Sequence, residues 1–77
     1  MTLLDLPHNQ DATILAMHVD DQYEERLHAV GICVGSTISK MYDSAQRPTQ
    51  PICVKTNTRS IFAISRTLAA HITLRIR

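Results

Sequence analysis

The sequence predicts a mainly β fold: a small antiparallel barrel of five short strands, with one helix inserted after the first strand and a single helical turn before the last. Segments in which apolar and polar residues alternate recur along the chain, and turn residues separate them. Only residues 20–30 have helical spacing over several turns. Closure into a barrel would also cover the edges that so small a sheet otherwise exposes.

The first strand is predicted over residues 12–19, after an entry segment. In that segment Leu3 and Leu6 are apolar anchors one turn apart, and Asn9 is the turn residue best able to adopt a positive φ. The strand carries apolar residues on both faces, with Ile14 and Ala16 on one face and Leu15, Met17 and Val19 on the other. We therefore expect both faces to be partly buried, one of them under the helix.

The helix is predicted over residues 20–30, with a start signal and a stop signal. Asp21 can cap its first turn, and Glu24 three positions later completes a capping box. Gly31 follows the last periodic residue, where helices often end in a left-handed conformation, and Gly35 then opens a strand. One face of the helix is apolar and should contact the sheet: Tyr23, Leu27 and Val30.

The remaining strands are predicted over residues 36–42, 51–56, 59–65 and 71–77. Residues 43–50 form a polar loop, Asn57 and Thr58 a tight turn, and residues 66–70 a single helical or 3₁₀ turn. The fourth strand contains a continuous apolar run, 61–64. In the last strand, three residues are expected to point inward: Ile72, Leu74 and Ile76.

Length and charge limit the possible functions. The chain of 77 residues forms one domain, 1–77, and its eight basic and seven acidic residues give a formal net charge of +1. That balance gives no electrostatic argument for binding nucleic acid or an anionic membrane. No apolar run approaches a membrane span, and no signal peptide is visible, so a cytoplasmic location is predicted. Cys33 and Cys53 are then expected to be reduced thiols.

Three segments together carry a resemblance to a known family: residues 3–9, 26–35 and 62–74. They contain leucines before a turn, Arg-Leu followed by two spaced glycines, and an apolar-Ala-Ile run followed by Ile-Thr-Leu. The chain resembles the FeoA family of small cytosolic proteins in bacterial ferrous iron transport systems. The sequence departs from the family pattern at Asn9, Val34 and Ser65, where glycine, proline and arginine are usual. The resemblance implies an SH3-like barrel with an inserted helix.

The residues able to bind a metal ion lack the spacing of a metal site. No Cys-x-x-Cys or His-x-x-x-His pair occurs. Glu24 and His28 would share a helix face, but two ligands do not make a site. We therefore predict no metal site and no cofactor, with Fe(II) or another divalent ion open but not supported by the spacing. The ligands considered are the acids of residues 20–25 and His8, His18, His28, His71, Cys33 and Cys53.

Catalysis and nucleic-acid binding have weaker support. Cys53 and His71 could form a nucleophile and base, but no third group is evident to orient them, so no catalytic residue and no enzyme activity are predicted. Four arginines near the C-terminus could form a basic strip, but without net positive charge or aromatic platforms we expect them to be solvated: Arg59, Arg66, Arg75 and Arg77.

Protein binding is the remaining class. The predicted partner surface combines the loop 43–50 with helix and post-helix residues: Glu25, His28, Ile32, Cys33 and Val34. The three apolar residues of the post-helix turn have an alternative interpretation, in which they plug the end of the barrel rather than contact a partner.

The resemblance implies a non-enzymatic accessory protein of ferrous iron uptake. Its partner would be the cytosolic, GTP-binding part of the FeoB transporter, and self-association is also open. The alternative is a metal-regulated module of the kind found in metal-dependent repressors. Against that alternative, the sequence begins at Met1 without a helix-turn-helix region. A small nucleic-acid-binding barrel is a third, weaker interpretation.

Overall fold

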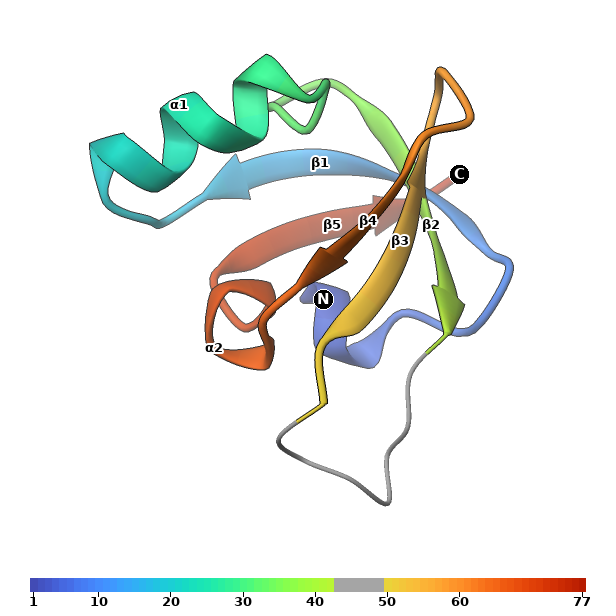
Figure 1. Cartoon of the computed structure of the whole chain (residues 1–77). Coiled ribbons are helices and arrows are strands. Elements are labelled where there is room, and N and C mark those ends of the chain that lie inside the picture. Colours follow the sequence, from blue (N-terminus) through green and yellow to red (C-terminus); the bar gives the residue numbers. More distant parts are fainter. Residues whose placement is uncertain (43–49) are drawn as a thin grey trace.

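The computed structural model describes residues 1–42 and 50–77 and shows five antiparallel strands in one strongly curved sheet (Figure 1). The strand order is β4-β3-β2-β1-β5. The elements follow the predicted order, preceded by a short 3₁₀ helix: η1 (Leu3–Asp5), β1 (Asp11–Met17), α1 (Asp21–Ala29), β2 (Thr37–Tyr42), β3 (Ile52–Thr56), β4 (Ile61–Ile64), α2 (Arg66–Ala69) and β5 (Ile72–Ile76). The predicted loop 43–50 lies, apart from its last residue, outside the described residues.

The core is almost entirely aliphatic and is built from every strand. Each strand contributes buried residues, and η1 and α2, which contact each other, add Leu3 and Ala69. The buried apolar residues are Leu3, Leu6, Ala12, Ile14, Ile32, Ile38, Ile52, Val54, Ile64, Ala69, Ile72 and Leu74. No helix within the described residues is long and apolar enough to cross a membrane.

The two outer strands of the sheet differ in how their edges are covered. Within the described residues no ladder joins β4 to β5. The N-terminal segment covers part of the β5 edge, because the Leu74 N–H donates to the Met1 carbonyl at 2.7 Å and Thr2 pairs with Thr73. Strand β4 pairs with β3 alone. The expectation that barrel closure covers every edge is therefore wrong for β4.

A bulge in β1 explains why its two faces do not alternate regularly. The register with β5 shifts between Ile14 and Ala16, so Leu15 is an extra residue and points into solvent. One extra residue exchanges the faces of all residues that follow it. Met17 therefore pairs with the buried Ile72 and packs against the core, on the same side as Ile14 rather than on the opposite side as predicted.

The N-cap of helix α1 lies one residue earlier than predicted. Asp20 rather than Asp21 occupies the N-cap position, and its side chain makes no capping hydrogen bond. Leu27 and Val30 pack against the core, whereas Tyr23, expected on the same face, is exposed. No residue of α1 is buried, so the helix contacts the barrel through its C-terminal end only.

The stop signal of α1 is confirmed at Gly31, which has a φ of +89°. The Gly31 N–H donates to the His28 carbonyl at 3.0 Å, and the Ile32 N–H donates to the Leu27 carbonyl at 2.8 Å. These two bonds form a Schellman motif, which commonly ends with an apolar contact between the residues at its two ends. Here those residues are Leu27 and Ile32, and Ile32 is fully buried in the core.

Two isoleucines on the outer strands of the sheet, Ile76 and Ile61, are exposed. Ile76 was expected to point inward but is exposed: it is the last residue of the edge strand β5, although its partner Ala12 on β1 is buried. In the apolar run of β4, Ile64 is buried and Phe62 packs against the core, while Ile61 is 58% exposed. The run is therefore apolar on both faces although only one face is covered.

A buried lysine joins β2 to the N-terminal segment. Lys40 is only 2% exposed, and its ammonium donates to the Leu4 carbonyl at 2.9 Å. Its own carbonyl accepts from the Asn9 N–H at 2.8 Å. Asn9 has a φ of +61°, as the sequence indicated. These contacts fix η1 beneath the barrel and leave the Leu3 and Leu6 side chains in the core.

Ser65 provides the N-cap of α2. Its hydroxyl oxygen accepts from the Leu68 N–H at 3.2 Å. Serine is among the best capping residues because its short side chain reaches an otherwise unbonded N–H. Ser65, which stands where the family pattern usually has arginine, therefore has a structural role in this chain.

The hairpin between β3 and β4 is longer than the predicted two-residue turn. The Thr56 N–H donates to the Ser60 carbonyl at 2.8 Å, so three residues form the loop. The last of these, Arg59, has a φ of +66°. A left-handed residue after two turn residues is the usual geometry of a three-residue hairpin loop, and glycine normally occupies this position.

Replacing Arg59 with glycine should therefore stabilise the protein. We expect the Arg59→Gly variant to raise the free energy of unfolding by about 0.5–1 kcal/mol, because the strain of a left-handed non-glycine residue exceeds the entropy cost of glycine. The measurement is the urea midpoint. Asn57→Gly is the control, since Asn57 has no positive φ and the same change there should not stabilise. An equal gain from both variants would contradict the explanation.

Candidate functional site

The predicted partner residues of α1 lie together on the exposed face of the helix. Glu25 and His28, with Asp21 and Glu24, line a shallow hollow along α1. All four side chains are exposed. Spacings of three and four residues place them on one helical face, opposite Leu27, which faces the core. Glu25 and His28 therefore lie near each other on α1, and their role in binding a partner stays a prediction.

The post-helix turn does not act as one apolar surface. Ile32 is 0% exposed and Val34 is 58% exposed. Cys33 is partly buried, and its Sγ lies 3.0 Å from the Ser36 hydroxyl. A fully buried side chain cannot contact a partner, so Ile32 does not belong to the predicted surface; for this residue the plugging interpretation fits. Val34 is the apolar residue that the turn presents to solvent.

The potential metal ligands are not gathered. Within residues 1–42 and 50–77 no three His, Cys, Asp or Glu side chains lie close enough together to hold a metal ion. Glu24 and His28 share a face of α1, as predicted, and the acids near them within the described residues do not complete a group able to hold a metal ion. Both cysteines are free thiols.

Cys53 and His71 lie on separate elements. Cys53 is half-buried on β3, and His71 is exposed in the turn between α2 and β5. The described residues contain no hydrogen bond between the two side chains. The structure therefore gives no reason to assign them a nucleophile and base pair.

The four arginines that were considered as a possible basic strip are divided among separate places. Arg75 and Arg77 line a groove on β1 and β5 with Leu15 and Ile76, and the Arg77 guanidinium donates to the Thr37 hydroxyl at 3.0 Å. Arg66 begins α2. Arg59 lies on the β3–β4 hairpin, beside Lys55.

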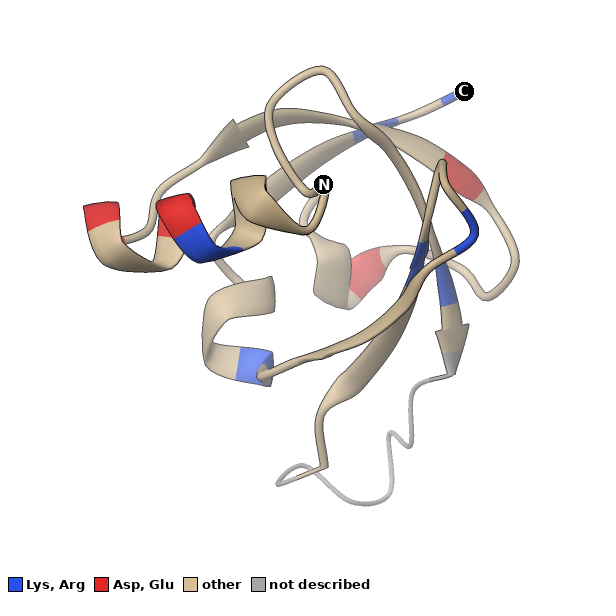
Figure 2. Cartoon of the chain, turned by 45° about the horizontal axis from the view of Figure 1, so that its top comes forward, with Lys and Arg blue, Asp and Glu red and all other residues tan. Residues whose placement is uncertain are grey.

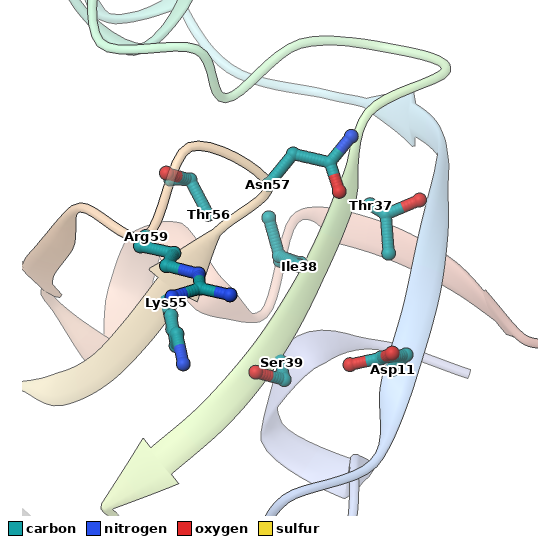
Figure 3. A pocket seen from close by; sticks show the side chains of 8 residues that line it. All are labelled: Asp11, Thr37, Ile38, Ser39, Lys55, Thr56, Asn57 and Arg59. Atoms are coloured by element: carbon teal, nitrogen blue, oxygen red, sulfur yellow. The ribbon is translucent and has the colours of Figure 1, made fainter.

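A second hollow was not predicted from the sequence. It has a volume of about 220 Å³ on the outer face of the sheet (Figure 3). The register places Asp11 opposite Ser39, and Ser39 opposite Lys55, so these side chains form one row across three strands. Such a row depends on strand pairing, which the sequence pattern does not reveal. The lining residues are Asp11, Thr37, Ile38, Ser39, Lys55, Thr56, Asn57 and Arg59.

Charges are unevenly distributed over the molecule. Acidic residues gather on α1, which also carries Arg26, whereas the other basic residues lie mainly on the sheet, on the hairpin, on α2 and near the C-terminus (Figure 2). The acids at the start of α1 also interact favourably with the positive end of the helix dipole. The exposed face of α1 therefore matches a partner surface of positive charge.

These features define a class: a small SH3-like β barrel whose exposed helix and grooves are suited to binding. A family model, the FeoA domain, matches residues 1–76. The chain belongs to the FeoA family. No curated protein matches the chain.

Solved structures show the same fold. The FeoA protein of Chlorobium tepidum is 22% identical, with a TM-score of 0.86, and the match covers 99% of this chain and 70% of that chain. A crystallised iron uptake regulatory protein, FeoA, is 19% identical, with a TM-score of 0.84 and coverage of 100% and 97%. Stenotrophomonas maltophilia FeoA, a prokaryotic SH3 domain protein complexed with zinc, is 22% identical, with a TM-score of 0.77 and coverage of 97% and 89%.

Proposed function

We propose that this chain is a non-enzymatic accessory protein of ferrous iron uptake, acting in the cytoplasm by docking on the GTP-binding region of a FeoB-type transporter. Membership of the FeoA family over nearly the whole chain carries the proposal. Stenotrophomonas maltophilia FeoA is described as a candidate ferrous iron transport activating factor, which agrees with an accessory role.

Helix α1 supplies the surface for this docking. A nine-residue helix is not stable alone in water, so contacts outside the helix must hold it. Here the Schellman motif and the packing of Leu27 and Val30 hold its C-terminal end, while no α1 residue is buried. The acidic face of the helix is not explained by packing against the barrel. We assign that face, with Val34 beside it in the chain, to the transporter contact.

The test is binding of the purified protein to the soluble cytosolic region of the transporter, measured by calorimetry without nucleotide, with GDP and with a GTP analogue. We expect the double variant Glu25→Gln, Val34→Ser to raise the Kd about tenfold, because it removes one charge contact and one apolar contact of about 0.5–1 kcal/mol each. Both side chains are exposed, so the urea midpoint should change little.

Asp11→Asn is the matched control, since it removes an exposed carboxylate on β1 rather than on α1. It should leave the Kd unchanged. Absence of binding in every nucleotide state would rule out the proposed partner. Binding that the double variant and the control weaken equally would rule out α1 as the docking surface.

A further inference from the structure

Strand β4 has an unpaired edge. It is the outermost strand next to β3, and its other side has no strand partner within the described residues. An unpaired strand edge presents N–H and C=O groups that can bind another extended chain.

The ladder with β3 identifies which groups of β4 face outward. The bond from the Thr56 N–H to the Ser60 carbonyl shows that Thr56 and Ser60 form a hydrogen-bonded pair of the ladder. In an antiparallel ladder every second residue pair exchanges hydrogen bonds, so Phe62 and Ile64 bond to β3. Ile61 and Ala63 lie between them. Their N–H and C=O groups therefore point away from the sheet.

Basic side chains lie one strand in from this edge, on β3, and on the hairpin that precedes β4. Ile61 is 58% exposed, although it lies in a strand that also contributes to the core. Lys55 lies directly opposite Ile61 in the ladder. Arg59 lies two residues before Ile61, and Figure 3 shows the Lys55 and Arg59 side chains close together along the hairpin. Lys55 and Arg59 also line the hollow on the outer face of the sheet, and Asp11 is the acidic residue that lines it. Ser39 lies between Asp11 and Lys55 in the row across the strands.

We propose that the β4 edge binds an extended, acidic segment of a partner protein by β-strand addition. The segment pairs its backbone with Ile61 and Ala63, places an apolar side chain beside Ile61, and extends carboxylates across β4 toward Lys55 and toward Arg59 on the hairpin. This surface is separate from the acidic face of α1, which favours a partner region of the opposite charge. The proposal therefore does not depend on docking at α1.

A second copy of this chain fits the edge less well. An antiparallel β4–β4 pair centred on Phe62 would set Arg59 of each copy opposite Ser65 of the other, one residue from Arg66. Like charges placed together in this way oppose association. An acidic segment meets the same cations with the opposite charge.

Hydrogen exchange measured by NMR tests the proposal, with a synthetic peptide of repeated Val-Thr-Glu-Thr as the probe, which places valine and glutamate on the same face of the added strand. Saturating peptide should slow exchange of the Ile61 and Ala63 amides at least about tenfold. The Phe62 and Ile64 amides, already bonded to β3, should change much less. A peptide with lysine in place of glutamate should bind more weakly. Slowed exchange elsewhere without slowed exchange at Ile61 and Ala63 would overturn the proposal.

Two variants separate the charge contribution from the backbone contribution. Lys55→Glu with Arg59→Glu should raise the Kd of the peptide at least about tenfold, because two favourable charge contacts become repulsive. Arg26→Glu on α1 is the control and should have no effect. Ala63→Pro removes an outward N–H without removing a bond to β3, so it should weaken binding in a protein that remains folded.

If the double variant on the hairpin and the Arg26→Glu control raised the Kd equally, Lys55 and Arg59 would not be the residues that attract the acidic peptide. Protection of Ile61 and Ala63 in the protein without peptide, lost on dilution, would show that a second copy occupies the edge and would also overturn the proposal.

Discussion

The Ile32→Ala variant is expected to lose about 2–5 kcal/mol of unfolding free energy, the range for truncating a fully buried large aliphatic side chain. Ile32 is 0% exposed and follows the Schellman glycine, so its side chain anchors both the core and the end of α1. A chain of this length has a total stability of about 4–12 kcal/mol. The substitution therefore removes a large fraction of the stability, which a urea titration followed by far-UV circular dichroism would measure.

Val34→Ala is the matched control two residues further on. Its side chain is mostly in solvent, so the loss should stay within about 0.5 kcal/mol. Similar losses from both variants would show that the post-helix turn packs as a unit, contrary to the structure. Weakened transporter binding by a folded Ile32→Ala protein, with none by Val34→Ser, would argue against the assigned docking surface.

The Leu3→Ala variant should also destabilise the protein by about 2–5 kcal/mol. Leu3 is fully buried, although it lies only three residues from the start of the sequence and belongs to a single 3₁₀ turn. Its loss should also release the N-terminal segment from β5, so the Leu74 amide, which donates to the Met1 carbonyl, should exchange faster with solvent. Urea titration and hydrogen exchange measure the two effects.

Leu4→Ala provides the comparison within the same turn. The Leu4 side chain is only partly buried, and its carbonyl would still accept from Lys40. We expect a loss of roughly 1 kcal/mol, because less apolar area leaves water. A larger loss at Leu4 than at Leu3 would mean that the 3₁₀ turn is oriented differently from the structure described above.

The order of elements could be predicted from the sequence because each element carries its own local signal. The glycine after α1 and the asparagine in the first turn both adopt the positive φ that their residue types favour. The alternation of apolar and polar residues predicted the strands, and the resemblance to the FeoA family predicted the SH3-like architecture.

What could not be predicted depends on pairing between distant strands. No local pattern distinguishes the bulge at Leu15 from regular alternation, so the face of Met17 was misassigned. The sequence predicts a two-residue hairpin loop, because arginine is not typical of a left-handed turn position and Arg59 therefore gives no sign of belonging to the loop.

The candidate site was predicted in part. Helical spacing was enough to place Glu25 and His28 on one face of α1. The sequence could not decide between Ile32 and Val34, because a three-residue apolar turn can face either way. The open edge of β4 was also missed, since strand order in a sheet is not a local property of the chain.

The position of β1 in the sheet has a consequence for folding kinetics. Its two neighbours are β2, which is close in sequence, and β5, which lies roughly sixty residues away and forms the longer ladder. Proteins dominated by such distant pairings have high relative contact order and fold in milliseconds to seconds rather than microseconds. During synthesis on the ribosome, β1 gains its second neighbour only after the last strand has emerged.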